Sequence, residues 1–166
     1  MEVLQAIKER RSTRSFNATP LPRDTIEELI DCARFAPSAR NVQPWNFTVV
    51  TKKDTLQKLG SLAENGSFIK ECACCIVVFC QDTKYYLEDG CAATENILIA
   101  ASGLGLSSCW VAGDKKPYEG KVKELLCAPS DFKLVSLIAL GHSDVKPPLP
   151  SKKPLSDIMH LEKFNG

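Results

Sequence analysis

The sequence predicts an α+β fold in which helices and strands form mixed layers, and three observations support this prediction. Patterns with the period of a helix alternate with patterns typical of strands along the chain. No repeat, low-complexity tract or linker occurs before residue 143. The chain has 166 residues, and a chain of about 150 residues buries roughly 70% of its unfolded surface. We therefore expect one domain over residues 1–166 with a substantial core.

The first two expected elements are amphipathic helices. One covers residues 3–9, with its apolar residues on a single face. The other follows the stretch LPRD, where Asp24 is a candidate N-cap and Glu27 completes the spacing of a capping box. This second helix stops before Pro37, and its apolar stripe consists of Ile26, Leu29, Ile30 and Ala33.

The remaining elements alternate between strands and helices. We expect strands at 46–51, 74–80, 106–111 and 132–141. We expect helices at 53–63, 89–105 and about 120–126. For the helix at 89–105, Asp89 is the candidate N-cap and either Gly103 or Gly105 is the candidate stop.

The stretch from Cys91 to Ser102 is apolar around nearly its whole circumference. A helix with so little polar surface is buried on most sides, either in the core or against a second copy of the chain. In a domain of this size the second arrangement is attractive, and we expect a homodimer.

Charge and hydropathy exclude several classes of partner. The 21 Lys and Arg residues nearly balance the 20 Asp and Glu residues, for a formal net charge of +1. There is thus no general basic field for a nucleic acid or a membrane surface. No apolar run approaches the roughly 20 residues of a membrane span, and no stretch has the pattern of a secretory signal. We expect a cytoplasmic protein.

The eight cysteines allow two interpretations. Four of them fall within ECACCIVVFC, at Cys72, Cys74, Cys75 and Cys80, which raises the question of a metal site. These cysteines run into a buried-strand pattern in which neighbouring side chains face opposite sides. Free cysteine commonly behaves as a small buried hydrophobe, so we expect reduced thiols that pack in the core and no metal.

The stretch ERRSTRSF gathers three arginines within eight residues, directly after the first expected helix. Positive charges this close repel one another unless an anion lies among them, so the cluster is either an anion site or a solvated surface. A second polar stretch, APSARNVQPWNF, lies between the second helix and the first strand. Taken alone, it is equally well explained as an ordinary connecting loop.

Together, the two stretches resemble the N-terminal signatures of the FMN-dependent nitroreductase family. The resemblance continues through GLSSCWVAG, VSLIALGHSD and KKPLSDIMH, and so covers essentially the whole chain. It implies a compact member of the family, with the nitroreductase-like fold: a central, mostly antiparallel sheet flanked by helices in an intertwined homodimer. It also implies that the anion is FMN.

The resemblance assigns site residues in three groups, all of them cofactor-binding. The phosphate and ribityl oxygens would be held by Arg10, Arg11 and Ser12, with Arg14 near N1 and O2 of the flavin and Lys152 and Lys153 closing over the phosphate. The partner subunit's flavin would be contacted by Pro37, Ser38, Ala39 and Asn41. The ring near N5 would be flanked by Trp110, Val111, Ala112 and Gly113, where a residue without Cβ allows close approach of backbone N–H groups.

The activity implied is reduction of nitroaromatics, quinones or similar acceptors by NADH or NADPH in a ping-pong cycle. Because the chemistry is carried by FMN N5, no residue of the chain is assigned as catalytic. Two alternatives stay open: a specialised relative such as a dehalogenase or flavin-processing enzyme, and a flavin-binding carrier or sensor without turnover. The short connection over residues 81–90 predicts an open pocket and leaves undecided whether Tyr85 or Tyr86 lines it.

Overall fold

The computed structural model describes residues 1–164, so the last two residues of the predicted domain lie outside the described part. Its centre is a four-stranded antiparallel sheet with the strand order β1-β2-β4-β3. The strands are β1 Trp45–Val50, β2 Cys74–Gln81, β3 Ser107–Ala112 and β4 Phe132–Gly141. The predicted mixed, mostly antiparallel architecture is therefore confirmed.

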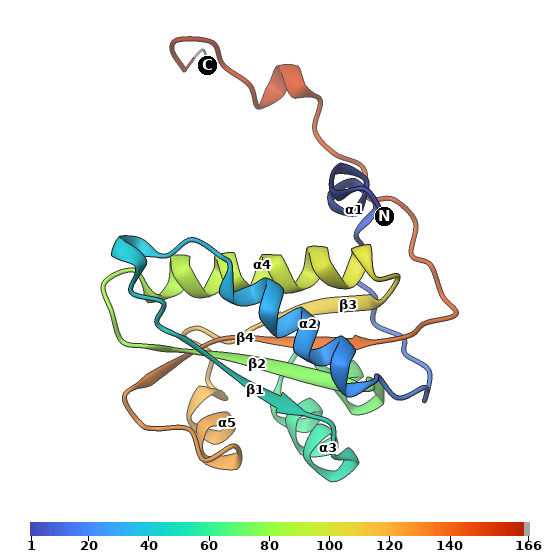
Figure 1. Ribbon diagram of the computed structural model, residues 1–166, viewed down its shortest axis with the longest axis vertical. Helices are drawn as coiled ribbons and strands as arrows, with labels where there is room; N and C mark the ends of the chain where they lie inside the picture. The colour runs from blue at the N-terminus through green and yellow to red at the C-terminus, as the bar shows by residue number, and fades with distance from the viewer. Residues whose placement is uncertain (165–166) are drawn as a thin grey trace.

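Helices cover both faces of the sheet, with α2 and α4 on one side and α3 and α5 on the other (Figure 1). The α-helices are α1 Val3–Glu9, α2 Arg23–Arg34, α3 Lys53–Leu62, α4 Tyr86–Gly103 and α5 Glu119–Leu125. Three short 3-10 helices accompany them: η1 Ala39–Asn41, η2 Ser67–Glu71 and η3 Leu155–Asp157. Within residues 1–164, no helix has the length and hydropathy needed to cross a membrane.

The central strand β2 supplies both halves of the core. Seven of its eight residues are buried, as expected of an apolar run in the middle of a sheet. One set of alternating side chains packs beneath α2 and α4, namely Cys74, Ile76, Val78 and Cys80. The other set, Cys75, Val77 and Phe79, packs toward α3 and α5. The register with β4 shifts between Val78 and Phe79.

Two predicted helix caps are wrong. In α2 the N-cap is Pro22, so Asp24 lies inside the first turn, and Glu27 accepts a 2.6 Å hydrogen bond from Arg23. That bond occupies the carboxylate that a capping box would have used. In α4 the helix starts at Tyr86, three residues before Asp89, and Asp89 instead accepts a tertiary hydrogen bond.

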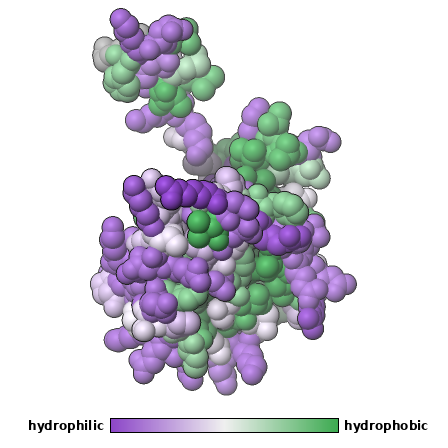
Figure 2. Space-filling view, turned by 60° about the vertical axis from the view of Figure 1, so that its left-hand side comes forward, coloured by the Kyte–Doolittle hydropathy of each residue, from purple (hydrophilic) through white to green (hydrophobic). Residues whose placement is uncertain are grey.

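The C-terminal segment after β4 runs past α1 and then stands away from the body (Figures 1 and 2). Its large apolar side chains are exposed: Val145, Leu149, Leu155, Ile158, Met159, Leu161 and Phe164. The apolar face of α1 is exposed as well, with Leu4 67% and Ile7 50% accessible. Exposed apolar surface of this extent is typical of an interaction site.

Candidate functional site

The arginine cluster is held at the edge of the sheet by β3. After α1 the chain becomes extended, and Ser12 forms a parallel bridge with Ser108. The Thr13 N–H donates a 2.9 Å hydrogen bond to the Ser108 carbonyl, and the Thr13 side chain is buried. Because the Thr13 side chain points into the protein, the side chains of its neighbours Ser12 and Arg14 point outward, since side chains alternate along extended backbone.

The cluster opens onto a groove of about 950 Å³ that also contains residues from the far end of the chain. Its apolar wall includes Pro147, Pro148 and Pro150. Its polar lining consists of Lys8, Arg10, Arg11, Ser12, Arg14, Glu95 and Lys152. Five cations and one carboxylate thus share this groove, which suits an anion with several oxygen acceptors.

The cations of the groove differ in how freely they can bind a ligand. Arg11 donates from Nη1 to the Lys8 carbonyl at 2.9 Å, so part of its guanidinium satisfies the end of α1. Arg10 lies 3.7 Å from the Glu95 carboxylate of α4. The Arg14 guanidinium lies over the Phe68 ring, 5.9 Å from its centroid. Lys153, unlike its neighbour Lys152, is not among the residues that line the groove.

The second predicted group lies at the other end of α4. The Ala39 N–H donates a 3.0 Å hydrogen bond to Asp89 in the first turn of the helix, whereas Ser102 in its last turn donates to the Ala6 carbonyl of α1. Asp89 and Ser102 are separated by about 20 Å along the helix axis, from the rise of 1.5 Å per residue. Among the groove-lining residues there is none from Pro37, Ser38, Ala39 or Asn41.

The third predicted group consists of the last three residues of β3 and the glycine that comes directly after it. Val111 is buried toward α3 and α5, Trp110 packs partly buried against the opposite core, and Ala112 is exposed. The Gly113 N–H donates a 2.9 Å hydrogen bond to the Val135 carbonyl. A Cβ at Gly113 would lie 2.5 Å from Cγ of Leu134. The reason for glycine here is therefore close packing on β4, and its N–H is already bonded within the chain.

Two acidic residues near these groups, Glu95 and Asp114, were given no role by the sequence analysis, and Asp89 was expected only to cap a helix. Asp114, just after β3, accepts a 2.6 Å hydrogen bond from the Tyr86 hydroxyl at the start of α4. That bond raises the pKa of Tyr86 above its ordinary value. Tyr85 is 41% exposed, with Lys84 over its ring. No local sequence pattern marks these residues, because each contact joins distant segments.

The cysteines of the β2 region are separate buried thiols. Burial raises the pKa of Cys72 to about 11 and the pKa values of Cys74 and Cys80 to about 12. All eight cysteines are free. In the part of the chain that the structure describes, no three His, Cys, Asp or Glu side chains are placed to hold a metal ion together.

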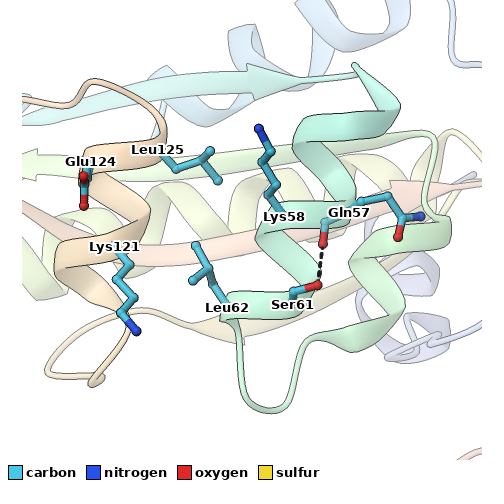
Figure 3. A pocket seen from close by; sticks show the side chains of 7 residues that line it. All are labelled: Gln57, Lys58, Ser61, Leu62, Lys121, Glu124 and Leu125. Carbon is cyan, nitrogen blue, oxygen red and sulfur yellow. Dashed lines mark hydrogen bonds between the residues drawn. The ribbon is translucent and has the colours of Figure 1, made fainter.

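A second hollow, of about 740 Å³, lies between α3 and α5 on the opposite face of the sheet (Figure 3). Leu62 and Leu125 face it from the two helices, with Lys58 and Lys121 nearby. None of the predicted site residues lines it. It belongs to a different face from the arginine groove.

The fold and the groove define a class: an α+β protein with a four-stranded antiparallel sheet and a cation-lined site suited to a phosphorylated ligand. The family model described as "Nitroreductase family" matches residues 7–74 and 80–142. The chain belongs to the nitroreductase family, which confirms the resemblance carried by its motifs.

Individual relatives match most of the length of this chain. A protein of Methanothermobacter thermautotrophicus, provisionally named NADH dehydrogenase/NAD(P)H nitroreductase, is 32% identical over 99% of this chain and 88% of its own length. The structure of an FMN-dependent nitroreductase from Clostridium difficile has a TM-score of 0.88 and 26% identity, covering 97% of this chain and 99% of that one. An iodotyrosine deiodinase of Danio rerio is 28% identical over 92% of this chain and 64% of its own length.

Proposed function

We propose that the protein is an FMN-dependent oxidoreductase that uses NADH or NADPH to reduce nitroaromatics, quinones or similar acceptors. Membership of the nitroreductase family and the names of two relatives, an NAD(P)H nitroreductase and an FMN-dependent nitroreductase, support this. The observation that carries the proposal is the meeting of Arg10, Arg14 and Lys152 in one groove, although Lys152 is far from the arginines in sequence.

The residues of the groove fit the phosphate of FMN. A phosphate monoester carries a charge of about −1.5 to −2 at neutral pH and offers three strong acceptor oxygens. Guanidinium and ammonium groups are the partners that bind such oxygens most strongly in proteins. The single carboxylate of the lining, Glu95, is paired with Arg10, which limits its repulsion of an anion.

Four residues of the groove have proposed roles that follow from their surroundings. Arg10 and Lys152 would bind the phosphate, and Glu95 would orient the Arg10 guanidinium from α4. Ser12 offers a hydroxyl to the phosphate and ribityl oxygens. Bound FMN supplies the electron transfer, so the chain contributes binding, orientation and electrostatics and needs no general acid or base.

The proposed functional unit is a homodimer in which each cofactor site uses two chains. Within one chain, the segment 37–41 lies near the first turn of α4, and the groove of Arg10 is lined from further along that helix by Glu95. Arg10→Ala and Asn41→Ala homodimers should each lose FMN binding, while a mixed dimer regains one normal site, because the other site receives both lesions. If both residues served the same chain's site, the mixed dimer would regain none.

An absorbance spectrum of the purified protein tests the proposal most directly. The protein should be yellow, and the released flavin should be FMN and not FAD. Anaerobic addition of NADH or NADPH should bleach the flavin, and a nitroaromatic or quinone should restore its colour. A colourless protein that takes up no added FMN would contradict the proposal. Flavin that binds but is never bleached by either donor would identify a carrier or sensor instead.

A specialised dehalogenating relative is the second candidate, and the similarity to an iodotyrosine deiodinase favours it. Both candidates share the fold and the phosphate groove, so these features do not separate them. Parallel assays with a nitroaromatic acceptor and with a halogenated tyrosine distinguish the two candidates. Release of halide at a rate comparable to nitro reduction would favour the dehalogenase.

A further inference from the structure

Asp89 is a buried acidic residue whose carboxylate has a specific hydrogen-bond partner. Its side chain is 5% exposed, and it lies in the first turn of α4. One carboxylate oxygen accepts a 3.0 Å hydrogen bond from the backbone N–H of Ala39, fifty residues earlier in the chain. The positive end of the helix dipole favours a negative charge in this turn. A buried carboxylate is otherwise costly, so this contact has a stabilising role.

The segment held by Asp89 is conformationally strained. Arg40, Asn41 and Gln43 have φ angles of 55°, 56° and 53°, in the left-handed region that non-glycine residues rarely occupy. Such residues persist only when surrounding contacts fix them, and they occur preferentially at functional sites. Here Ser38 accepts hydrogen bonds from the Gln43 and Asn41 N–H groups, at 2.9 and 3.0 Å. The loop is therefore folded around Ser38 and attached to α4 through Asp89.

We propose that Asp89 is a positioning residue that holds the segment 37–41 in the conformation that completes the cofactor site of a second copy of the chain. The inference rests on the proposed function, because it needs a cofactor site shared by two chains. Asp89 acts through the Ala39 N–H and touches no cofactor itself. Its effect is exerted on the site whose Arg10 belongs to the other chain.

Single variants give the first test. Asp89→Ala should weaken FMN binding by about ten-fold or more, because a hydrogen bond to a charged acceptor is lost. Asp89→Asn keeps an acceptor oxygen and should bind within about three-fold of the native protein, since its amide oxygen replaces the carboxylate oxygen. Glu88→Ala, which removes an exposed acid from the same turn, is the matched control and should leave the affinity unchanged. Dissociation constants are measured by quenching of flavin fluorescence.

A second variant removes the same hydrogen bond from its other end, in case Asp89→Ala does not fold. Ala39→Pro deletes the donor N–H, and the preceding residue Ser38 already has the extended conformation that precedes proline, with φ −136° and ψ 150°. It should weaken FMN binding to the same extent as Asp89→Ala. Native affinity in a folded Ala39→Pro protein would overturn the inference.

Mixed dimers separate positioning of the partner's site from a general structural effect. A purified dimer of Asp89→Ala with Arg10→Ala should regain one normal FMN site, whereas a dimer of Asp89→Ala with Asn41→Ala should regain none. The reverse pattern would place the effect in the same chain's site and overturn the inference. Failure of both mixtures while Arg10→Ala with Asn41→Ala succeeds would overturn it too. A native protein that binds no FMN would reject the proposed function and this inference together.

Discussion

At the scale of single residues, Arg14 differs from the other cations of the groove. Its guanidinium lies over the face of Phe68, 5.9 Å from the ring centroid, while Arg10 is paired with Glu95. A guanidinium on an aromatic face keeps its charge and its N–H edges available in the plane of the group. We therefore expect Arg14 to respond to charge that develops on a bound cofactor.

Arg14→Ala should lower the flavin midpoint potential. If Arg14 faces the N1 and O2 end of the ring, its loss weakens binding of the reduced, anionic flavin more than binding of the oxidised flavin, by about 1.5–3 kcal/mol for one charge-assisted bond. Spectroelectrochemical titration against dyes of known potential measures the change. Arg14→Lys keeps the charge and is the control. Equal weakening of both forms with an unchanged potential would instead assign Arg14 to the phosphate.

The sequence predicted the residues of the groove better than the residues that support them. Arg10, Ser12 and Arg14 are adjacent in a recognisable motif, so the sequence alone grouped them. Glu95 and Asp89 belong to no motif, and their roles arise only when α4 is packed against other segments. The motif KKP did not distinguish Lys152 from Lys153, because that choice depends on the path of the proline-rich segment before it.

At the scale of elements, β2 explains the closely spaced cysteines without a metal. Alternation along the strand sends Cys74 and Cys80 to one core and Cys75 to the other, so the thiols do not converge. Desolvation raises the pKa of each of them. A thiol with a raised pKa contains less thiolate, which is the form that reacts.

Thiol labelling at pH 8 should therefore distinguish β2 from the surface. Cys127 is exposed and should react rapidly with Ellman's reagent, whereas the thiols of Cys74, Cys75 and Cys80 should react only after unfolding. Cys127→Ser is the control and should remove the fastest phase, leaving the slower reaction of the half-buried Cys32 and Cys91. Fast reaction of the β2 thiols in the folded protein would contradict the buried strand.

Gly113 provides a test of how tightly β3 and β4 are packed at the end of the sheet. Gly113→Ala should destabilise the fold by about 1–3 kcal/mol, as overpacked sites do, because its Cβ would lie 2.5 Å from Cγ of Leu134. Gly120→Ala in α5 is the matched control, since a Cβ there meets nothing within 4 Å. Urea unfolding measures both. A Gly113→Ala variant as stable as the native protein would show that Leu134 can move aside.

The elements themselves were predictable because each has a clear period. Within residues 1–164, the four strands and five α-helices occur close to where the sequence patterns place them. The errors are at helix starts, where a predicted cap competes with other hydrogen bonds, which are local in α2 and tertiary in α4. Asp89 has the chemistry of an N-cap, but α4 extends one turn further to Tyr86, and the carboxylate binds Ala39. Sequence reasoning alone gives no measure of that competition.

At the scale of the whole molecule, a single copy of the chain leaves many large apolar side chains exposed. Part of α4 is covered within the chain, because Asn96 donates a 3.0 Å hydrogen bond to the Cys32 carbonyl of α2 and Ser102 donates to Ala6 of α1. The outer face of α1 and the C-terminal segment stay exposed. A soluble monomer rarely exposes contiguous apolar surface of this kind.

We therefore expect the C-terminal segment to be buried against a second copy of the chain. Leu155 and Ile158 are 71% and 57% exposed in the single chain, and complete burial of such a side chain contributes about 1.5–3 kcal/mol. Replacing both by Glu should raise the dimer dissociation constant by roughly a hundred-fold or more, since each 1.4 kcal/mol is a factor of ten. Sedimentation velocity over a range of concentrations measures this constant. Ser156→Glu adds a charge between the two positions without removing apolar surface, and it should leave the dimer nearly intact.

Unchanged dimerisation of the Leu155→Glu, Ile158→Glu variant would exclude the segment from the interface. A native protein that sediments as a monomer would reject both the dimer and the cofactor site shared between chains.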